Sequence, residues 1–144
     1  MSRAPNRRRS SHEPGQALVE FSLTIPIFLL MLVAVFDVGR GIYTYNALSE
    51  AARDLARISA THVGLPVGTS DATVQRIAAI RGITPAMSDP VFICTDLYGA
   101  SVAAEDCTSG DYVRVTVTAP YTPDAFLGLG GTINLTSTSS VQVP

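Results

Sequence analysis

The sequence predicts an α+β protein in which a long N-terminal helix packs on a small antiparallel β-sheet. Three observations support this fold class. An uncharged apolar run extends from Phe21 to Phe36, apolar residues then recur at helical spacing as far as Ile58, and the last third of the chain alternates apolar and polar residues as strands do. The 144 residues suffice for one small domain beside the helix. The predicted regions are a basic leader over 1–15, a helix over 16–62 and an outer α+β domain over 63–144.

The composition excludes several classes of protein and of chemistry. Hydrophobic residues make up 47% of the chain and charged residues 15%, so the chain as a whole is not intrinsically disordered. The basic residues of the N-terminal segment are Arg3, Arg7, Arg8 and Arg9, whereas the remainder of the chain is acidic. This distribution argues against a nucleic-acid-binding domain, and the absence of lysine excludes a lysine Schiff base or a phosphate-loop lysine.

The apolar run predicts a helix that spans a membrane once. A spanning helix needs about 20 residues, which the run reaches when Ala17, Leu18 and Val19 are counted and Glu20 lies at the cytoplasmic edge. Arginines precede the run, so the N-terminus is expected in the cytoplasm and the outer domain on the other side. No small-x-small cleavage site follows the run, so it does not fit an ordinary signal peptide.

Two features within the predicted helix have structural consequences. Pro26 removes one backbone hydrogen bond and clashes with the preceding turn, so we expect a kink there. Asp37 and Arg40 lie three residues apart on one helix face, where they can form an ion pair at the outer headgroup level. We interpret this pair as a marker of where the helix leaves the membrane.

Beyond the membrane, the helix should continue with one apolar face formed by Leu48, Ala51, Ala52, Leu55 and Ile58, and end before Gly64 and Pro66. In the outer domain, Ser70 is placed to cap a second helix that runs to Arg81. The predicted strands are Val91–Cys94, Asp111–Tyr121 and Thr132–Val143.

Cys94 and Cys107 are the only two cysteines. An even pair of cysteines outside the cytoplasm predicts a disulfide, whereas a metal site would require more ligands. The acidic residues near Cys107, which are Glu105, Asp106 and Asp111, are interpreted as a solvated loop in preference to a cation site. We therefore expect neither a metal nor a cofactor.

No catalytic constellation is evident. His62 is the only histidine beyond the predicted span, and nothing in the sequence indicates a partnered Ser-His-Asp arrangement around it. The chain is therefore not expected to be an enzyme. The weakly charged segment Tyr121–Leu129 is a candidate contact surface, or alternatively a loop folded onto the core.

The most informative motif is an ordered run of residues around the span. It comprises Gly15–Phe21 (GQALVEF), Pro26, Phe36–Arg40 (FDVGR) and Tyr45–Arg53 (YNALSEAAR). This run resembles the TadE-like family of small pseudopilins or minor pilins of tight-adherence (Flp, type IVc) pili. The resemblance implies a pilin-like fold and cleavage by a prepilin peptidase after Gly15, which would make Gln16 the first residue of the mature chain.

The charge of Glu20 gives that pattern a physical reason. A carboxylate is costly in hydrocarbon, so Glu20 needs water or a partner. Cleavage would give Gln16 an α-amine that is protonated at neutral pH and lies one helical turn from Glu20. The resemblance implies that Glu20, followed by the aromatic Phe21, pairs with such an amine during assembly. The alternative is that Glu20 simply lies among the lipid headgroups.

Two classes of function follow. The first is a subunit of the bacterial cytoplasmic membrane that acts in pilus structure or assembly. Its partners would be a prepilin peptidase, other pilin or pseudopilin subunits, the membrane assembly platform and the lipid bilayer. The second is an uncleaved, single-pass anchored extracellular binding module. The junction at Gly15 favours the first class, because an ordinary anchor has no need of a glycine at a fixed distance from a buried glutamate.

Overall fold

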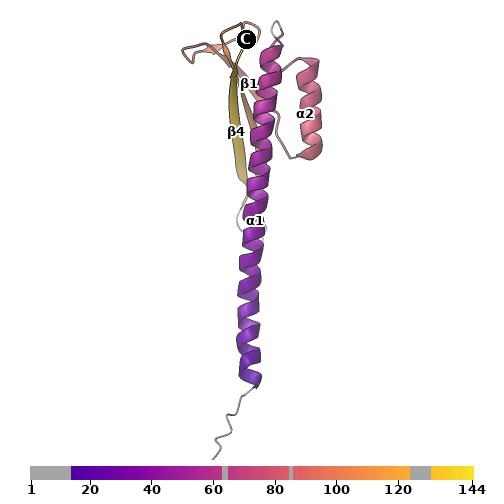
Figure 1. The fold of residues 1–144 in the computed structure, drawn as a ribbon, viewed down its shortest axis with the longest axis vertical. Helices are drawn as coiled ribbons and strands as arrows, with labels where there is room; N and C mark the ends of the chain where they lie inside the picture. Colours follow the sequence, from indigo (N-terminus) through magenta and orange to yellow (C-terminus); the bar gives the residue numbers. More distant parts are fainter. Residues whose placement is uncertain (1–13, 63–64, 85, 124–130) are drawn as a thin grey trace, which may run out of the picture.

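The computed structural model describes residues 14–62, 65–84, 86–123 and 131–144 of the chain, and the predicted leader therefore lies almost entirely outside the described residues. The fold is α+β, as predicted from the sequence: a long helix and a short helix accompany one antiparallel sheet (Figure 1). The elements are α1 (Pro14–Thr61), α2 (Asp71–Ile83), β1 (Val91–Thr95), β2 (Ser101–Val102), β3 (Tyr112–Tyr121) and β4 (Ile133–Gln142).

The sheet has four strands in the order β2-β1-β3-β4, and every neighbouring pair is antiparallel. Val115 of β3 lies opposite Phe92 of β1 on one side and Ser139 of β4 on the other. The three predicted strands are present. The fourth, β2, was not predicted, because two residues are too few to show an alternating pattern.

The core lies between the outer half of α1 and the sheet. One face of β3 is buried and the other is not, as the alternation in the sequence predicts. On the helix side, Leu48 and Leu55 supply the large side chains, and small alanines between them let the sheet approach the helix closely. The core residues of these two elements are Leu48, Ala52, Leu55, Ala56, Ala60, Val113, Val115, Val117 and Ala119.

The short helix α2 lies beside α1 (Figure 1). As predicted, Ser70 caps its start, where the Ser70 hydroxyl accepts a hydrogen bond from the backbone N–H of Thr73 at 3.2 Å. The helix ends at Ile83, two residues beyond the predicted Arg81, because the N–H of Thr84 still bonds to the carbonyl of Ile80.

The first half of α1 extends away from the domain (Figure 1). Its large apolar side chains from Leu18 to Val38 are exposed, and in the most apolar stretch of the helix none is buried within the molecule. This helix is long and apolar enough to cross a membrane. It runs without interruption through Pro26, and the kink expected there stays a prediction.

Candidate functional site

The residues of the predicted processing and assembly site lie in the first turns of α1. Gly15, Gln16, Glu20 and Phe21 are all exposed, and a methyl group added at Gly15 would meet no atom within 4 Å. The side-chain amide of Gln16 donates a hydrogen bond to a carboxylate oxygen of Glu20 at 3.3 Å. Residues 16 and 20 therefore face each other across one helical turn, which is the spacing that pairing of a Gln16 α-amine with Glu20 requires.

Polar side chains further along the apolar segment bond to the helix itself. The hydroxyl of Ser22 donates to the carbonyl of Val19 at 2.8 Å, and that of Thr24 donates to the carbonyl of Glu20 at 2.8 Å. Such back-bonding satisfies a hydroxyl that has no access to water. These two polar residues are thus compatible with a lipid environment.

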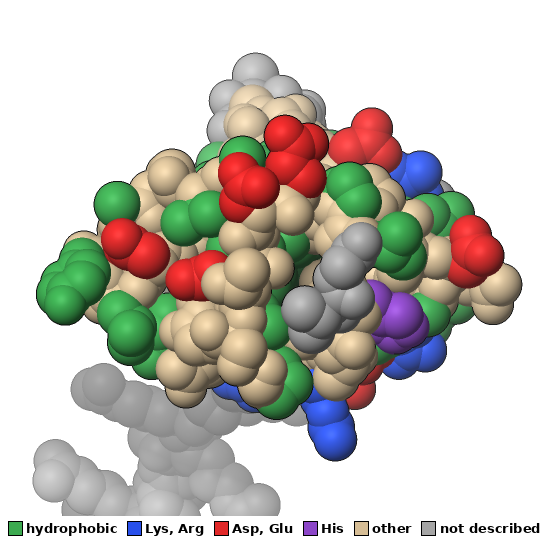
Figure 2. Space-filling view, turned by 90° about the horizontal axis from the view of Figure 1, so that it is seen from above, with side chains coloured by type: hydrophobic (Ala, Val, Ile, Leu, Met, Phe, Trp, Pro, Cys, Tyr) green, Lys and Arg blue, Asp and Glu red, His purple; other side chains and the backbone are tan. Residues whose placement is uncertain are grey.

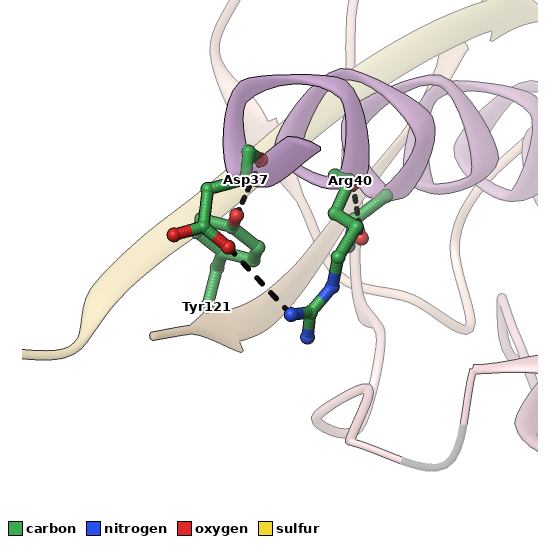
Figure 3. A network of polar contacts seen from close by, with 4 residues as sticks. Asp37, Arg40 and Tyr121 are labelled. Atoms are coloured by element: carbon green, nitrogen blue, oxygen red, sulfur yellow. Dashed lines mark hydrogen bonds and ion pairs between the residues drawn. The ribbon is translucent and has the colours of Figure 1, made fainter. Parts of the chain in front are cut away.

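The predicted exit pair is formed, and a third residue joins it. Asp37 is 6% exposed, and one of its carboxylate oxygens lies 3.6 Å from a guanidinium nitrogen of Arg40. The hydroxyl of Tyr121 donates a hydrogen bond to the backbone carbonyl of Asp37 at 2.5 Å (Figure 3). The structure therefore brings the end of β3 onto α1 where the apolar segment ends.

Sequence reasoning placed Tyr121 in a candidate contact segment and did not connect it with Asp37. The two residues are 84 positions apart, and no local pattern links them. Tyr121 itself is half-buried against α1, and most of the remainder of that segment, 124–130, lies outside the described residues. The nearest signal in the sequence is Gly41, because a glycine leaves room on the helix for an aromatic ring: a Cβ there would lie 3.6 Å from the Tyr121 ring.

In the outer domain, Cys94 and Cys107 form a disulfide with their Cα atoms 5.9 Å apart. It attaches the loop after β2 to the buried end of β1. Asp111 lies near both sulfur atoms, and these three residues are the group of potential metal ligands found in the described part of the chain. Both sulfurs belong to the disulfide, however, and the Asp111 carboxylate accepts bonds from the N–H and hydroxyl of Thr108. Asp111 therefore caps the turn that begins at Thr108, and its carboxylate is engaged there.

His62 lies at the C-terminal end of α1. Its Nδ1 is 2.8 Å from the carbonyl of Ile58 and 3.3 Å from the hydroxyl of Thr61. These contacts satisfy a free carbonyl in the last turn of the helix, which is a structural role. Neither contact activates a nucleophile, because the Thr61 hydroxyl itself donates to the same carbonyl at 2.8 Å.

Comparison with protein-family models identifies residues 15–57 as matching the TadE-like protein family. This confirms the resemblance over the segment where its motifs lie, from the glycine before the apolar run to the amphipathic part of α1. The match extends over the part of α1 that carries Gln16, Glu20, Asp37 and Arg40. Neither the comparison with curated proteins nor the comparison with solved structures gave a match.

Proposed function

From the premise that residues 15–57 form a TadE-like, pilus-associated segment, we propose that this protein is a pseudopilin or minor pilin of a tight-adherence pilus. A prepilin peptidase would cleave it after Gly15. The observation that carries the proposal is the geometry of the start of α1. A long apolar helix surface that the protein leaves uncovered begins two residues after Gly15, and Gln16 bonds to Glu20 within its first turns.

The uncovered helix needs an apolar environment. Large aliphatic and aromatic side chains on all sides of α1 are exposed before the domain begins, and exposed apolar surface of this extent is unstable in water. Lipid covers such a helix while the subunit is in the membrane, and the apolar helices of other subunits can cover it in a filament. The same surface thus serves as anchor and as assembly interface.

Glu20 adds specificity to that interface. A lone carboxylate within an apolar bundle is costly, but a carboxylate that meets a protonated amine is tolerated and fixes the register of the helices. Cleavage after Gly15 would create that amine on Gln16. The amine of the same chain or that of a neighbouring subunit can then pair with Glu20.

The remaining features fit a structural role. A structural role is in keeping with the TadE-like match, and the outer domain is a small sheet and helix held to α1 by a compact apolar core. In this proposal the N-terminus faces the cytoplasm, the domain lies outside, and the partners are the peptidase, other pilin subunits, the assembly platform and the bilayer.

The first test is the mass of the N-terminal peptide of the protein recovered from its own cell envelope. A chain that begins at Gln16 supports the proposal. The variant Gly15→Val should retain the leader, whereas Gly39→Val should be cleaved normally; Gly39 is a suitable control because it too lies on α1 with open space around it. An uncleaved chain beside an active peptidase, shown by processing of another prepilin, would favour the anchored binding module instead.

The second test separates cleavage from assembly. Glu20→Gln removes the charge but keeps the side-chain shape, so it should be inserted and cleaved but should co-purify poorly with other pilin subunits. Glu50→Gln changes an exposed glutamate in the outer part of the same helix and should assemble normally. Normal assembly of Glu20→Gln would show that pairing with the amine is not needed.

A further inference from the structure

The outer domain exposes apolar side chains at the end that faces the first half of α1. We propose, on the basis of the membrane location proposed above, that this membrane-proximal rim, formed by Tyr43, Ile83 and Ile133, rests on the lipid headgroup layer. The outer domain would then contact the membrane itself, in addition to being anchored to it by α1.

Three separate elements contribute to the rim. Tyr43 lies on α1, Ile83 is the last residue of α2, and Ile133 is the first residue of β4. Ile83 lines the same hollow as Arg40, Tyr43 and Tyr121, so the end of α2 and the end of β3 both lie beside this part of α1. Ile133 is the register partner of Tyr121, which places the start of β4 at the same end of the sheet.

These side chains are exposed to an unusual degree for their type. Ile83 is 76% exposed, Tyr43 71% and Ile133 49%, whereas Leu48 of α1 is buried and Ile80 of α2 and Leu135 of β4 are partly buried against the core. Isolated exposed apolar residues need no explanation, but a set contributed by three elements at one end of a domain indicates a contact surface. The cost of exposing them is removed when they enter the interfacial layer of a bilayer.

The depth of the span supports lipid as the occupant. The span of about 20 helical residues counted from Ala17 ends at Phe36, so Asp37 and Arg40 lie at the outer headgroup level. Asp37 does not oppose this placement, because it is buried and paired with Arg40. Tyr43 then lies within one turn of the boundary, the position in which tyrosine is enriched because its ring is apolar and its hydroxyl polar.

The opposite end of the domain is rich in acidic side chains. Viewed from that end, the surface carries several carboxylates (Figure 2). The turns there include the exposed acids Glu105 and Asp106, with Asp96 and Asp111 less exposed. The same turns also expose Leu97 and Tyr98, so the far end differs from the rim by the acids gathered there and not by a lack of apolar side chains. Acids gathered at the end farthest from the span are compatible with a domain whose other end lies on the membrane.

The attachment between helix and sheet fixes the orientation of the rim. Because the Tyr121 hydroxyl bonds to the backbone of Asp37, the end of β3 cannot move away from α1 without losing that bond. The rim therefore stays at a constant height above the boundary. Lipid contact would be a permanent property of the membrane-inserted subunit and would be lost when the subunit leaves the bilayer.

Tryptophan fluorescence can test this directly, because the natural chain contains no tryptophan. The full chain is reconstituted in phosphatidylcholine vesicles whose acyl chains either carry bromine, which quenches tryptophan on contact, or do not. The rim variants are Ile83→Trp and Ile133→Trp. The matched control is Tyr98→Trp, an aromatic position that is 96% exposed in the turn after β1, at the far end of the domain. A fourth variant, Val35→Trp, reports on the exposed surface of the span itself.

We expect brominated lipid to reduce the emission of Ile83→Trp, Ile133→Trp and Val35→Trp and to leave that of Tyr98→Trp unchanged. Quenching of Val35→Trp without quenching of either rim variant would overturn the inference and leave the membrane span intact. Loss of quenching at all positions would instead overturn the membrane location on which the inference rests. A blue shift of the rim variants that grows with the protein-to-lipid ratio, without quenching, would place a second copy of the chain on the rim and would also overturn it.

Discussion

The hydroxyl of Tyr121 donates a hydrogen bond to the backbone carbonyl of Asp37, and this contact joins the last residue of β3 to the point where the apolar half of α1 ends (Figure 3). Asp37 is otherwise held by Arg40, one turn further along the helix. The outer domain is therefore attached to the helix at its lower end as well as through its core. Further along α1, the sheet packs on the apolar face that begins at Leu48, and the Ser137 hydroxyl of β4 donates a hydrogen bond to that of Ser49 at 3.1 Å.

Replacing Tyr121 with phenylalanine should weaken this attachment. Tyr121→Phe keeps the ring but removes the donor, so we expect the outer domain to lose about 0.5–1.5 kcal/mol of unfolding free energy. Chemical denaturation of the detergent-solubilised chain, followed by near-ultraviolet circular dichroism, measures the loss. Tyr98→Phe removes a hydroxyl from a fully exposed side chain and should have no effect. Equal midpoints for both variants would show that the bond is not stabilising.

Gly41 should tolerate a methyl group but not a larger side chain. An added Cβ would be 3.6 Å from the Tyr121 ring, an ordinary van der Waals distance, whereas a leucine must displace the ring. Gly41→Ala should therefore be neutral or slightly stabilising, since alanine also favours the helix. Gly41→Leu should lower the free energy of unfolding. The loss in the double variant should be smaller than the sum of the losses from Gly41→Leu and Tyr121→Phe, because both changes abolish the hydrogen bond from Tyr121 to Asp37. Full additivity of the two in a denaturation experiment would contradict this account.

The two halves of α1 should respond differently to truncation of a leucine. Leu55 is fully buried in the core, so Leu55→Ala should destabilise the outer domain by about 2–5 kcal/mol. Leu18 is 69% exposed in the apolar half, and Leu18→Ala should leave the unfolding midpoint of the domain unchanged. A similar effect of both variants would mean that the apolar half of α1 also packs against the domain.

The disulfide should stabilise a domain whose core is small. Cys94 and Cys107 close a loop with a sequence separation of 13, and removal of such a cross-link costs on the order of 3 kcal/mol. Reductant should thus lower the unfolding midpoint of the natural chain. The variant with serine at both positions should have the lower midpoint from the outset and should not respond to reductant. A natural chain that is indifferent to reductant under unfolding conditions would refute this prediction.

Much of this architecture follows from the sequence alone. The apolar run, its arginine-rich flank and the helical repeat after it specify one long helix, because hydrophobic periodicity depends on local backbone geometry. The alternation of β3 specifies which of its faces is buried, and Ser70 specifies the start of α2 by capping. The motifs around Gly15 and Glu20 indicated the TadE-like family, and the family match confirms that resemblance over residues 15–57.

Contacts between distant segments were decided only by the tertiary structure. Strand β2 exists because Cys94 and Thr95 of β1 offer an edge to Ser101 and Val102, a pair too short to show a strand pattern of its own. The bond from Tyr121 to Asp37 depends on how far β3 extends along α1. The membrane-proximal rim depends on the end of α2 and the start of β4 lying near the middle of α1. Neighbouring residues fix the periodicity of a helix or strand, whereas packing between elements fixes which of their ends meet, and that packing leaves no local pattern in the sequence.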